Sequence, residues 1–129
     1  MEIIKKVLFI DDDRIFLDTQ TKFLKLSGFD VMKSPDGLKG FTSLERASPN
    51  IIVCDIMMEN FSGLDFLNKF TQTHFFHKIP FLCISGYTTE GMAEQCMNYG
   101  ADGYLRKPVD CDILICIIFA LISYYSPGL

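Results

Sequence analysis

Five short apolar segments recur along this chain, and they constrain its fold more than any other feature. Each is at most four residues long and is followed by a stretch long enough to form a helix. A strand with one face in water alternates apolar and polar residues, whereas an unbroken apolar run indicates a strand that is buried on both faces. The five segments are Val7–Ile10, Val31–Met32, Ile51–Cys54, Phe81–Ile84 and Tyr104–Leu105.

The stretches between these segments complete five strand–helix units. A buried parallel sheet needs helices on both faces, and right-handed crossovers leave few ways to connect the units. We therefore expect an α/β domain with a doubly wound, five-stranded parallel sheet flanked by five helices. The expected helices are Arg14–Ser27, Asp36–Ala47, Gly63–Thr73, Thr89–Tyr99 and Cys111 to about Tyr124.

The length and composition fit one globular domain and exclude some functions. For a chain of 129 residues we expect one domain over residues 1–124, followed by a tail or the start of a linker at 125–129. The net charge of −4, without a cluster of Lys and Arg, argues against binding nucleic acid. The five cysteines form no CxxC pair and no zinc-binding spacing, and their odd number favours a reducing cytoplasm.

Acidic residues and one lysine follow the apolar segments at the points where strands should end. Asp11 and Asp12 follow the first segment, Asp55 follows the third, and Lys107 precedes Pro108 just after the fifth. The carboxyl ends of parallel strands share one edge of a sheet, so these side chains should meet there. Two carboxylates about 4 Å apart repel by roughly 4 kcal/mol at an effective dielectric constant of 20. The cluster therefore predicts a site for Mg²⁺ (or Mn²⁺) together with a phosphoryl group.

Four motifs, taken together, resemble the receiver domains of two-component response regulators, and the resemblance covers essentially the whole chain. The motifs are VLFIDDD, IIVCD, FLCIS and GADGYLRKP. Their spacing fits the family, with 43 residues from Asp12 to Asp55, 30 from Asp55 to Ser85 and 22 from Ser85 to Lys107. The resemblance implies a flavodoxin-like fold, similar to the chemotaxis regulators, with strand order 2-1-3-4-5.

The resemblance also implies a role for each residue of the acidic cluster. Asp55 would be the nucleophile that accepts the phosphoryl group. Asp12 would bind Mg²⁺ directly, Asp11 largely through water, and Met57 through its backbone carbonyl. The donor would be a phosphohistidine on a sensor histidine kinase or a phosphotransfer protein. The chain would then be a signalling domain rather than an enzyme, catalysing only its own phosphorylation and slow dephosphorylation.

Further residues would contact the phosphoryl group or respond to it. Ser85 would donate its hydroxyl to one phosphoryl oxygen, and Lys107 would place its ammonium on another. The Lys107–Pro108 bond would be cis, as in the family. Tyr104 occupies the family's switch position. Phosphorylation would draw Ser85 and Tyr104 inward and alter the face made by the fourth helix, the fifth strand and the fifth helix.

Four residues beside the site depart from the family's pattern or crowd the site. Glu59 adds an acid in the loop after Asp55, where many receivers instead have a proline that stiffens the loop. Gly86 replaces a frequent alanine and opens space beside the phosphoryl group. The bulky side chains of Met57 and Tyr87 should overhang the site and hinder an attacking water. We therefore expect slow self-dephosphorylation.

The last helix is apolar at every position from Ile113 to Ile122, which is unusual for a helix on a protein surface. The run is too short for a membrane span of about 20 residues. From the helical period we expect one face to pack on the sheet, formed by Leu114, Ile117, Ile118 and Leu121. We expect a second copy of the chain, an output domain or another partner to cover the remaining face, formed by Ile115, Cys116, Phe119 and Ile122.

Two other functions are compatible with parts of this pattern. In a phosphohydrolase of the haloacid-dehalogenase type, Asp11 would be the nucleophile, Asp13 the acid and Lys107 the conserved lysine. Such an enzyme needs an acid pair at a later strand end, which this chain lacks, and it would leave Asp55 without a role. Asp13 is also better placed to cap the first helix. The other alternative is an interaction module of the same fold that signals by binding alone. Replacing Asp55 by Asn distinguishes all three functions.

Overall fold

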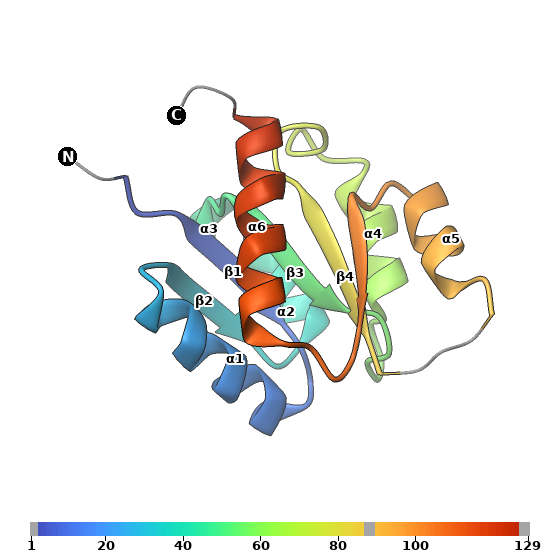
Figure 1. Cartoon of the computed structure of the whole chain (residues 1–129). Coiled ribbons are helices and arrows are strands. Elements are labelled where there is room, and N and C mark those ends of the chain that lie inside the picture. The colour runs from blue at the N-terminus through green and yellow to red at the C-terminus, as the bar shows by residue number, and fades with distance from the viewer. Residues whose placement is uncertain (1–2, 87–89, 127–129) are drawn as a thin grey trace.

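The computed structural model describes residues 3–86 and 90–126, which form a parallel sheet with helices on both faces (Figure 1). The strands lie in the order β2-β1-β3-β4-β5, so the predicted fold class and strand order are confirmed. Every neighbouring pair is parallel. The strands are β1 (Lys6–Ile10), β2 (Asp30–Ser34), β3 (Ile51–Asp55), β4 (Phe81–Ser85) and β5 (Gly103–Arg106).

Six helices, rather than the five expected, are present in the part of the chain that the structure describes. The expected second helix is divided at Ser43, which ends α2 and precedes α3. Its hydroxyl donates to the Gly40 carbonyl at 2.8 Å, a back-bond that competes with the helical hydrogen bonds. The helices are α1 (Arg14–Leu26), α2 (Gly37–Thr42), α3 (Leu44–Ala47), α4 (Gly63–Phe70), α5 (Met92–Asn98) and α6 (Cys111–Tyr125).

Alternate residues of each central strand enter two separate hydrophobic cores. Val7 and Phe9 pack with residues of α1 and α6 on one face of the sheet. Leu8 and Ile10 pack on the other face, with residues of α3, α4 and α5. Figure 1 shows α6 lying across the first of these faces. Because both faces are covered, the strands need apolar residues at every position, which explains the unbroken runs in the sequence.

The buried stripe of α6 differs from the one expected. Leu114, Ile118 and Ile122 are the buried residues of this helix, at spacings of four residues. The prediction that Ile122 points outward is wrong, since its exposed fraction is only 5%. The helix is rotated so that this stripe faces the sheet, and it leaves Ile117 and Leu121 only half-buried.

The other residues expected on the outer face of α6 are at least partly accessible. Phe119 is 48% exposed and Cys116 is exposed, whereas Ile115 is half-buried. The Phe119 ring also packs on Phe29, with 4.9 Å between the ring centroids, so part of this face is covered within the chain. Within the described ranges, no helix is both long enough and apolar enough to cross a bilayer.

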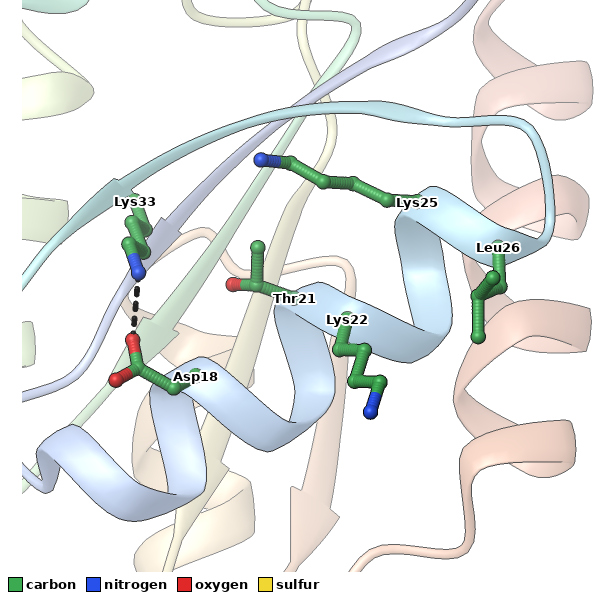
Figure 2. A pocket seen from close by; sticks show the side chains of 6 residues that line it. All are labelled: Asp18, Thr21, Lys22, Lys25, Leu26 and Lys33. Atoms are coloured by element: carbon green, nitrogen blue, oxygen red, sulfur yellow. Dashed lines mark hydrogen bonds and ion pairs between the residues drawn. The ribbon is translucent and has the colours of Figure 1, made fainter.

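An ion pair joins α1 to the edge strand β2. The Lys33 ammonium donates to Asp18 Oδ1 at 2.7 Å across a shallow groove of about 380 Å³ (Figure 2). Lys22 and Lys25 also line this groove. Both partners of the ion pair are largely exposed, so it contributes little to stability and mainly orients the two side chains.

Asp102 ties the end of the last helix to the start of β4. Its carboxylate accepts the Phe81 backbone N–H at 2.8 Å and the Tyr125 hydroxyl at 2.6 Å. Burial, together with the bond to Asp102, raises the pKa of Tyr125, so its hydroxyl stays protonated and able to donate. This bond lies one residue beyond the expected end of the helix, and it holds the C-terminal end of α6 against the domain.

Replacing Tyr125 by Phe should therefore destabilise the fold without disturbing its packing. We expect the free energy of unfolding at neutral pH to fall by about 1.5–3 kcal/mol, the range for a hydrogen bond to a charged group. Urea denaturation checks the change. Tyr124→Phe is the matched control, because Tyr124 is 82% exposed and should tolerate the same change. Equal stability of the two variants would contradict this role for Asp102.

Candidate functional site

The acidic residues predicted from the strand ends do meet at one edge of the sheet. Asp11 follows β1 directly, and Asp55 is the last residue of the neighbouring strand β3. One carboxylate oxygen from each of Asp11, Asp12 and Asp55 lies within 4.8 Å of the other two. Asp11 and Asp55 are buried and Asp12 is exposed. Two of the three carboxylates are therefore shielded from water, and the third, that of Asp12, is open to solvent.

Lys107 supplies the positive charge next to this cluster. Its ammonium lies 2.8 Å from Asp11 Oδ2 and 3.8 Å from Asp55 Oδ2, so it contacts Asp11 more closely. The Lys107–Pro108 peptide bond is cis, as predicted. The Lys107 backbone N–H donates to the Ser85 carbonyl at 2.8 Å, and this bond fixes the lysine beside the end of β4.

Asp11 is held from several directions. Its backbone N–H donates to the Ser34 carbonyl at 3.1 Å, and its Oδ1 accepts the Asp13 N–H at 2.9 Å. Asp11 is fully buried, and this burial raises the pKa of its carboxyl group. The Lys107 ammonium opposes this effect. Asp11 is therefore a fixed anchor for the lysine rather than an accessible nucleophile.

Asp55 is the most perturbed acid of the site. Burial, and then the negative charge of Asp11, raises the pKa of Asp55 to about 7, although the Lys107 ammonium and the Met57 backbone N–H oppose the shift. The N–H of Met57 donates to Asp55 Oδ1 at 3.3 Å. One lysine does not balance three nearby carboxylates, which leaves the site electrostatically suited to a further cation.

The donor set fits a small divalent cation. All three converging groups are carboxylates, the oxygen ligands that Mg²⁺ prefers, and their number leaves coordination positions for water. Asp12 also accepts the Glu59 backbone N–H at 3.4 Å, which brings the loop after β3 to the cluster. The exposed side of Asp12 opens into a groove of about 380 Å³ that Glu59 and Asp36 also line.

Asp13 does not join the cluster as an acid. Its carboxylate accepts the Phe16 N–H at 3.1 Å and thereby caps α1, as expected. This bond turns the chain from the end of β1 into the helix, directly after the two acids of the site. The haloacid-dehalogenase alternative needs Asp13 as a catalytic acid, and in that role Asp13 could no longer cap α1.

The remaining predicted residues lie around the cluster with different exposure. Ser85 ends β4 and is fully buried, and Tyr104 is half-buried on β5. Met57 is 47% exposed, and Gly86 is exposed beside Lys107. Tyr87, the other residue expected to overhang the site, lies outside the described residues. The switch, overhang and backbone-ligand roles of these residues stay predictions.

Two residues that support the site were not predicted for it. The Phe16 ring lies under the Lys107 ammonium, 4.3 Å from centroid to Nζ, and stabilises its charge. Gly63 begins α4 and donates its N–H to the Ile56 carbonyl at 3.0 Å, which closes the loop after Asp55. A Cβ on Gly63 would collide with the Asp55 carbonyl and lie 2.7 Å from Ile56 Cα. A glycine just after a helix-capping serine was the only sequence signal for this close approach.

Comparisons with known proteins agree with this fold. A family model for the response regulator receiver domain matches residues 7–119. The CheY-like receiver domain protein of Methanospirillum hungatei JF-1 has a TM-score of 0.88 and 24% identity, over 95% of this chain and 97% of that one. A receiver domain protein of Clostridium thermocellum has a TM-score of 0.86 and 25% identity, over 94% and 96% of the two chains. The chain therefore belongs to the response regulator receiver domain family.

Curated relatives place the same domain within longer proteins. The DNA-binding regulator RpaA of Synechocystis sp. is 28% identical over 91% of this chain and 48% of its own length. A cyclic di-GMP phosphodiesterase of Thermotoga maritima is 28% identical over 84% of this chain and 28% of its own length. The chain thus spans about half, or less, of the length of these two relatives.

Replacing Gly63 by Ala should disturb the Asp55 loop, although alanine is the better helix former. The new methyl group must push the Asp55 and Ile56 backbone away, so we expect the free energy of unfolding to fall by about 1–3 kcal/mol. Urea denaturation measures this change. Gly86→Ala is the control, because among the described residues a Cβ there would meet only Lys107 Cδ, at 3.6 Å. An unchanged stability of Gly63→Ala would show that the loop yields without cost.

The metal-free protein should become less stable as the pH rises. Between its usual pKa of 3.8 and the raised value of about 7, the folded state keeps a proton on Asp55 that the unfolded state has released. The free energy of unfolding, measured with urea in EDTA, should fall by on the order of 2 kcal/mol from about pH 5.5 to about pH 8.

The variant Asp55→Asn tests the source of this pH dependence. The free energy of unfolding of this variant should fall much less than that of the wild type as the pH rises. At the higher pH the variant should therefore be the more stable protein. Glu45→Gln is the matched control, since it removes one exposed acid from α3 and should keep the pH dependence of the wild type. The same slope in all three proteins would exclude Asp55 as the titrating group.

Proposed function

We propose that this receiver domain accepts a phosphoryl group on Asp55 and passes on a signal through the face that contains α5, β5 and α6. The observation that carries the proposal is the convergence of three carboxylates within 4.8 Å, with the Lys107 ammonium beside two of them. Such a site suits phosphoryl transfer, which depends on alignment and charge neutralisation more than on covalent chemistry.

The residues of the cluster would have different roles in phosphoryl transfer. Asp11, Asp12, Asp55 and the Met57 carbonyl would hold Mg²⁺ (or Mn²⁺), which when bound neutralises charge on the phosphoryl oxygens. Asp55 supplies the attacking carboxylate oxygen. Lys107 is placed to exchange its contact with Asp55, at 3.8 Å, for a phosphoryl oxygen. Asp11 keeps the lysine in position during this exchange because their ion pair is shorter, at 2.8 Å.

Ser85 and Tyr104 would transmit the phosphorylated state to the outer face of the domain. Ser85 ends β4, and Tyr104 lies within the neighbouring strand β5, opposite Cys83 of β4. The Ser85 hydroxyl would bind a phosphoryl oxygen, and Tyr104 would move inward with it. The two positions of these residues would then define two populated states, whose balance phosphorylation shifts.

The partners follow from the family and from α6. The donor would be a phosphohistidine on a sensor histidine kinase or a phosphotransfer protein in the cytoplasm. The exposed apolar residues of α6, including Phe119 and Cys116, would be covered by an output domain, a partner or a second copy of the chain. Apart from its own phosphorylation and slow dephosphorylation, the domain would catalyse no reaction.

The two alternatives have less support. A phosphohydrolase with Asp11 as nucleophile would need an accessible Asp11, yet this residue is fully buried and paired with Lys107. It would also need Asp13 as an acid, whereas Asp13 caps α1. An interaction module independent of phosphorylation remains compatible with the fold, and it differs from the main proposal only in what happens at Asp55.

Incubation with acetyl phosphate and Mg²⁺ tests the proposal directly. Intact-mass measurement should show an increment of about 80 Da, the mass of one phosphoryl group, that disappears with EDTA and in Asp55→Asn. Lys107→Gln should take up the group much more slowly, because the phosphoryl charge then lacks its fixed cation.

Glu45→Gln serves as the matched control, since Glu45 is an exposed acid of α3 that does not belong to the cluster. It should be phosphorylated like the wild type. Folded protein that takes up no phosphoryl group from acetyl phosphate or a phosphohistidine donor would favour the binding-only module. An increment that persists in Asp55→Asn would exclude Asp55 as the acceptor.

A further inference from the structure

The Lys107 ammonium contacts an aromatic ring as well as the buried carboxylates. The centroid of the Phe16 ring lies 4.3 Å from Lys107 Nζ. Asp11 Oδ2 lies 2.8 Å and Asp55 Oδ2 lies 3.8 Å from the same nitrogen. The lysine side chain is only 17% exposed, so the ammonium is largely removed from water. The ring therefore replaces part of the hydration of this cation without offering it a hydrogen bond.

Neighbouring contacts fix the position of the Phe16 ring. Phe16 lies in the first turn of α1, and its backbone N–H donates to the Asp13 carboxylate at 3.1 Å. The Asp13 N–H in turn donates to Asp11 Oδ1 at 2.9 Å. In the core the ring makes an edge contact with the fully buried Phe9, at 6.2 Å between centroids. Because Lys107 pairs with Asp11, these contacts close a loop that fixes the ring and the ammonium relative to one another.

An aromatic face holds a cation differently from a hydrogen-bond acceptor. A carboxylate binds an ammonium at a defined distance and direction, whereas the face of a ring attracts a cation anywhere within about 6 Å of its centroid. Lys107 can therefore shift from Asp55 toward a phosphoryl oxygen and keep its contact with the ring. A lysine side chain is otherwise flexible and its ammonium strongly hydrated, so without the ring more of its conformations would point into solvent.

We propose that Phe16 is a positioning residue for phosphoryl transfer, which acts through Lys107 and keeps its ammonium over the acidic cluster during the reaction. In this step an Asp55 carboxylate oxygen forms a bond to phosphorus, and the bond from phosphorus to the donor's oxygen breaks. With acetyl phosphate, acetate leaves with that electron pair. Lys107 neutralises charge on the transferred oxygens. This role of Phe16 rests on the function proposed above.

A purely structural role for Phe16 predicts a different response to fluorination of its ring. Fluorine atoms withdraw electron density from the ring and weaken the attraction of its face for a cation, with little change in shape. Packing depends on the shape of the ring, whereas positioning of Lys107 depends on its negative face. Fluorinated rings therefore separate the two roles.

The test replaces Phe16 by phenylalanines with one, two or three ring fluorines and follows uptake of the phosphoryl group from acetyl phosphate and Mg²⁺ by intact mass. The rate should fall with each added fluorine, by about threefold to tenfold in all. Phe16→Leu should be slowed at least as much, and Phe16→Tyr, which retains an aromatic face, should recover most of that loss. The same fluorinated residues in place of Phe23, a 44% exposed ring of α1, are the control and should leave the rate unchanged.

The fluorinated series in the Lys107→Gln background shows whether the ring acts through the lysine. That variant is slow already, and fluorination of Phe16 should slow it no further, because the cation that the ring holds is absent. In the unphosphorylated protein, the NMR signals of the methylene next to the Lys107 ammonium should be shifted upfield by the ring, and this shift should disappear in Phe16→Leu. Circular dichroism checks that each variant is folded.

The possible failures can be told apart. Equal rates throughout the fluorinated series, in a protein that is phosphorylated on Asp55, would overturn the role of Phe16 alone. A fluorine effect that persists in Lys107→Gln would show that the ring does not act through the lysine, and so would the absence of the upfield shift. A wild type that takes up no phosphoryl group would overturn the proposed function, and this role of Phe16 with it.

Discussion

Repulsion between buried carboxylates is the constraint on which the rest of this structure depends. Asp11 and Asp55 lose their water when the sheet forms, and Lys107 compensates only part of their charge, since it lies 2.8 Å from one and 3.8 Å from the other. The remaining imbalance shows in the pKa of Asp55, which burial and Asp11 raise to about 7. A protein that tolerates such a cost at one sheet edge needs a rigid scaffold beneath it and a cation or ligand above it.

The scaffold meets this need through parallel strands that end together. β1 and β3 are neighbours, so Asp11, which follows β1, and Asp55, which ends β3, are adjacent without any long loop. Lys107 comes from beyond β5 and crosses the end of β4, where its backbone bonds to Ser85 and its ammonium rests on Phe16. Gly63 lets α4 approach the Asp55 backbone closely. On α5, by contrast, Cys96 is the only buried residue.

The unbroken apolar runs predicted a parallel sheet buried on both faces, and the residues that follow them predicted the converging acids and the position of Lys107. The order of the strands was implied by the resemblance to receiver domains, not by the runs. The sequence did not predict the division of the second helix, which results from one hydroxyl back-bond at Ser43. It placed Ile122 on the wrong side of α6, since an all-apolar helix gives no contrast from which to read its rotation. Phe16 and Gly63 were missed because their roles depend on distances between elements that are far apart in the chain.

Direct titration of EDTA-treated protein with Mg²⁺ in a calorimeter, at about pH 8, tests the central claim that the carboxylate cluster is built for a divalent cation. One ion per chain should bind to the wild type, and both Asp12→Asn and Asp55→Asn should weaken binding by at least an order of magnitude, because each loses a charged ligand. Glu45→Gln should bind like the wild type. Absence of saturable binding, or binding that survives both cluster substitutions, would contradict the account.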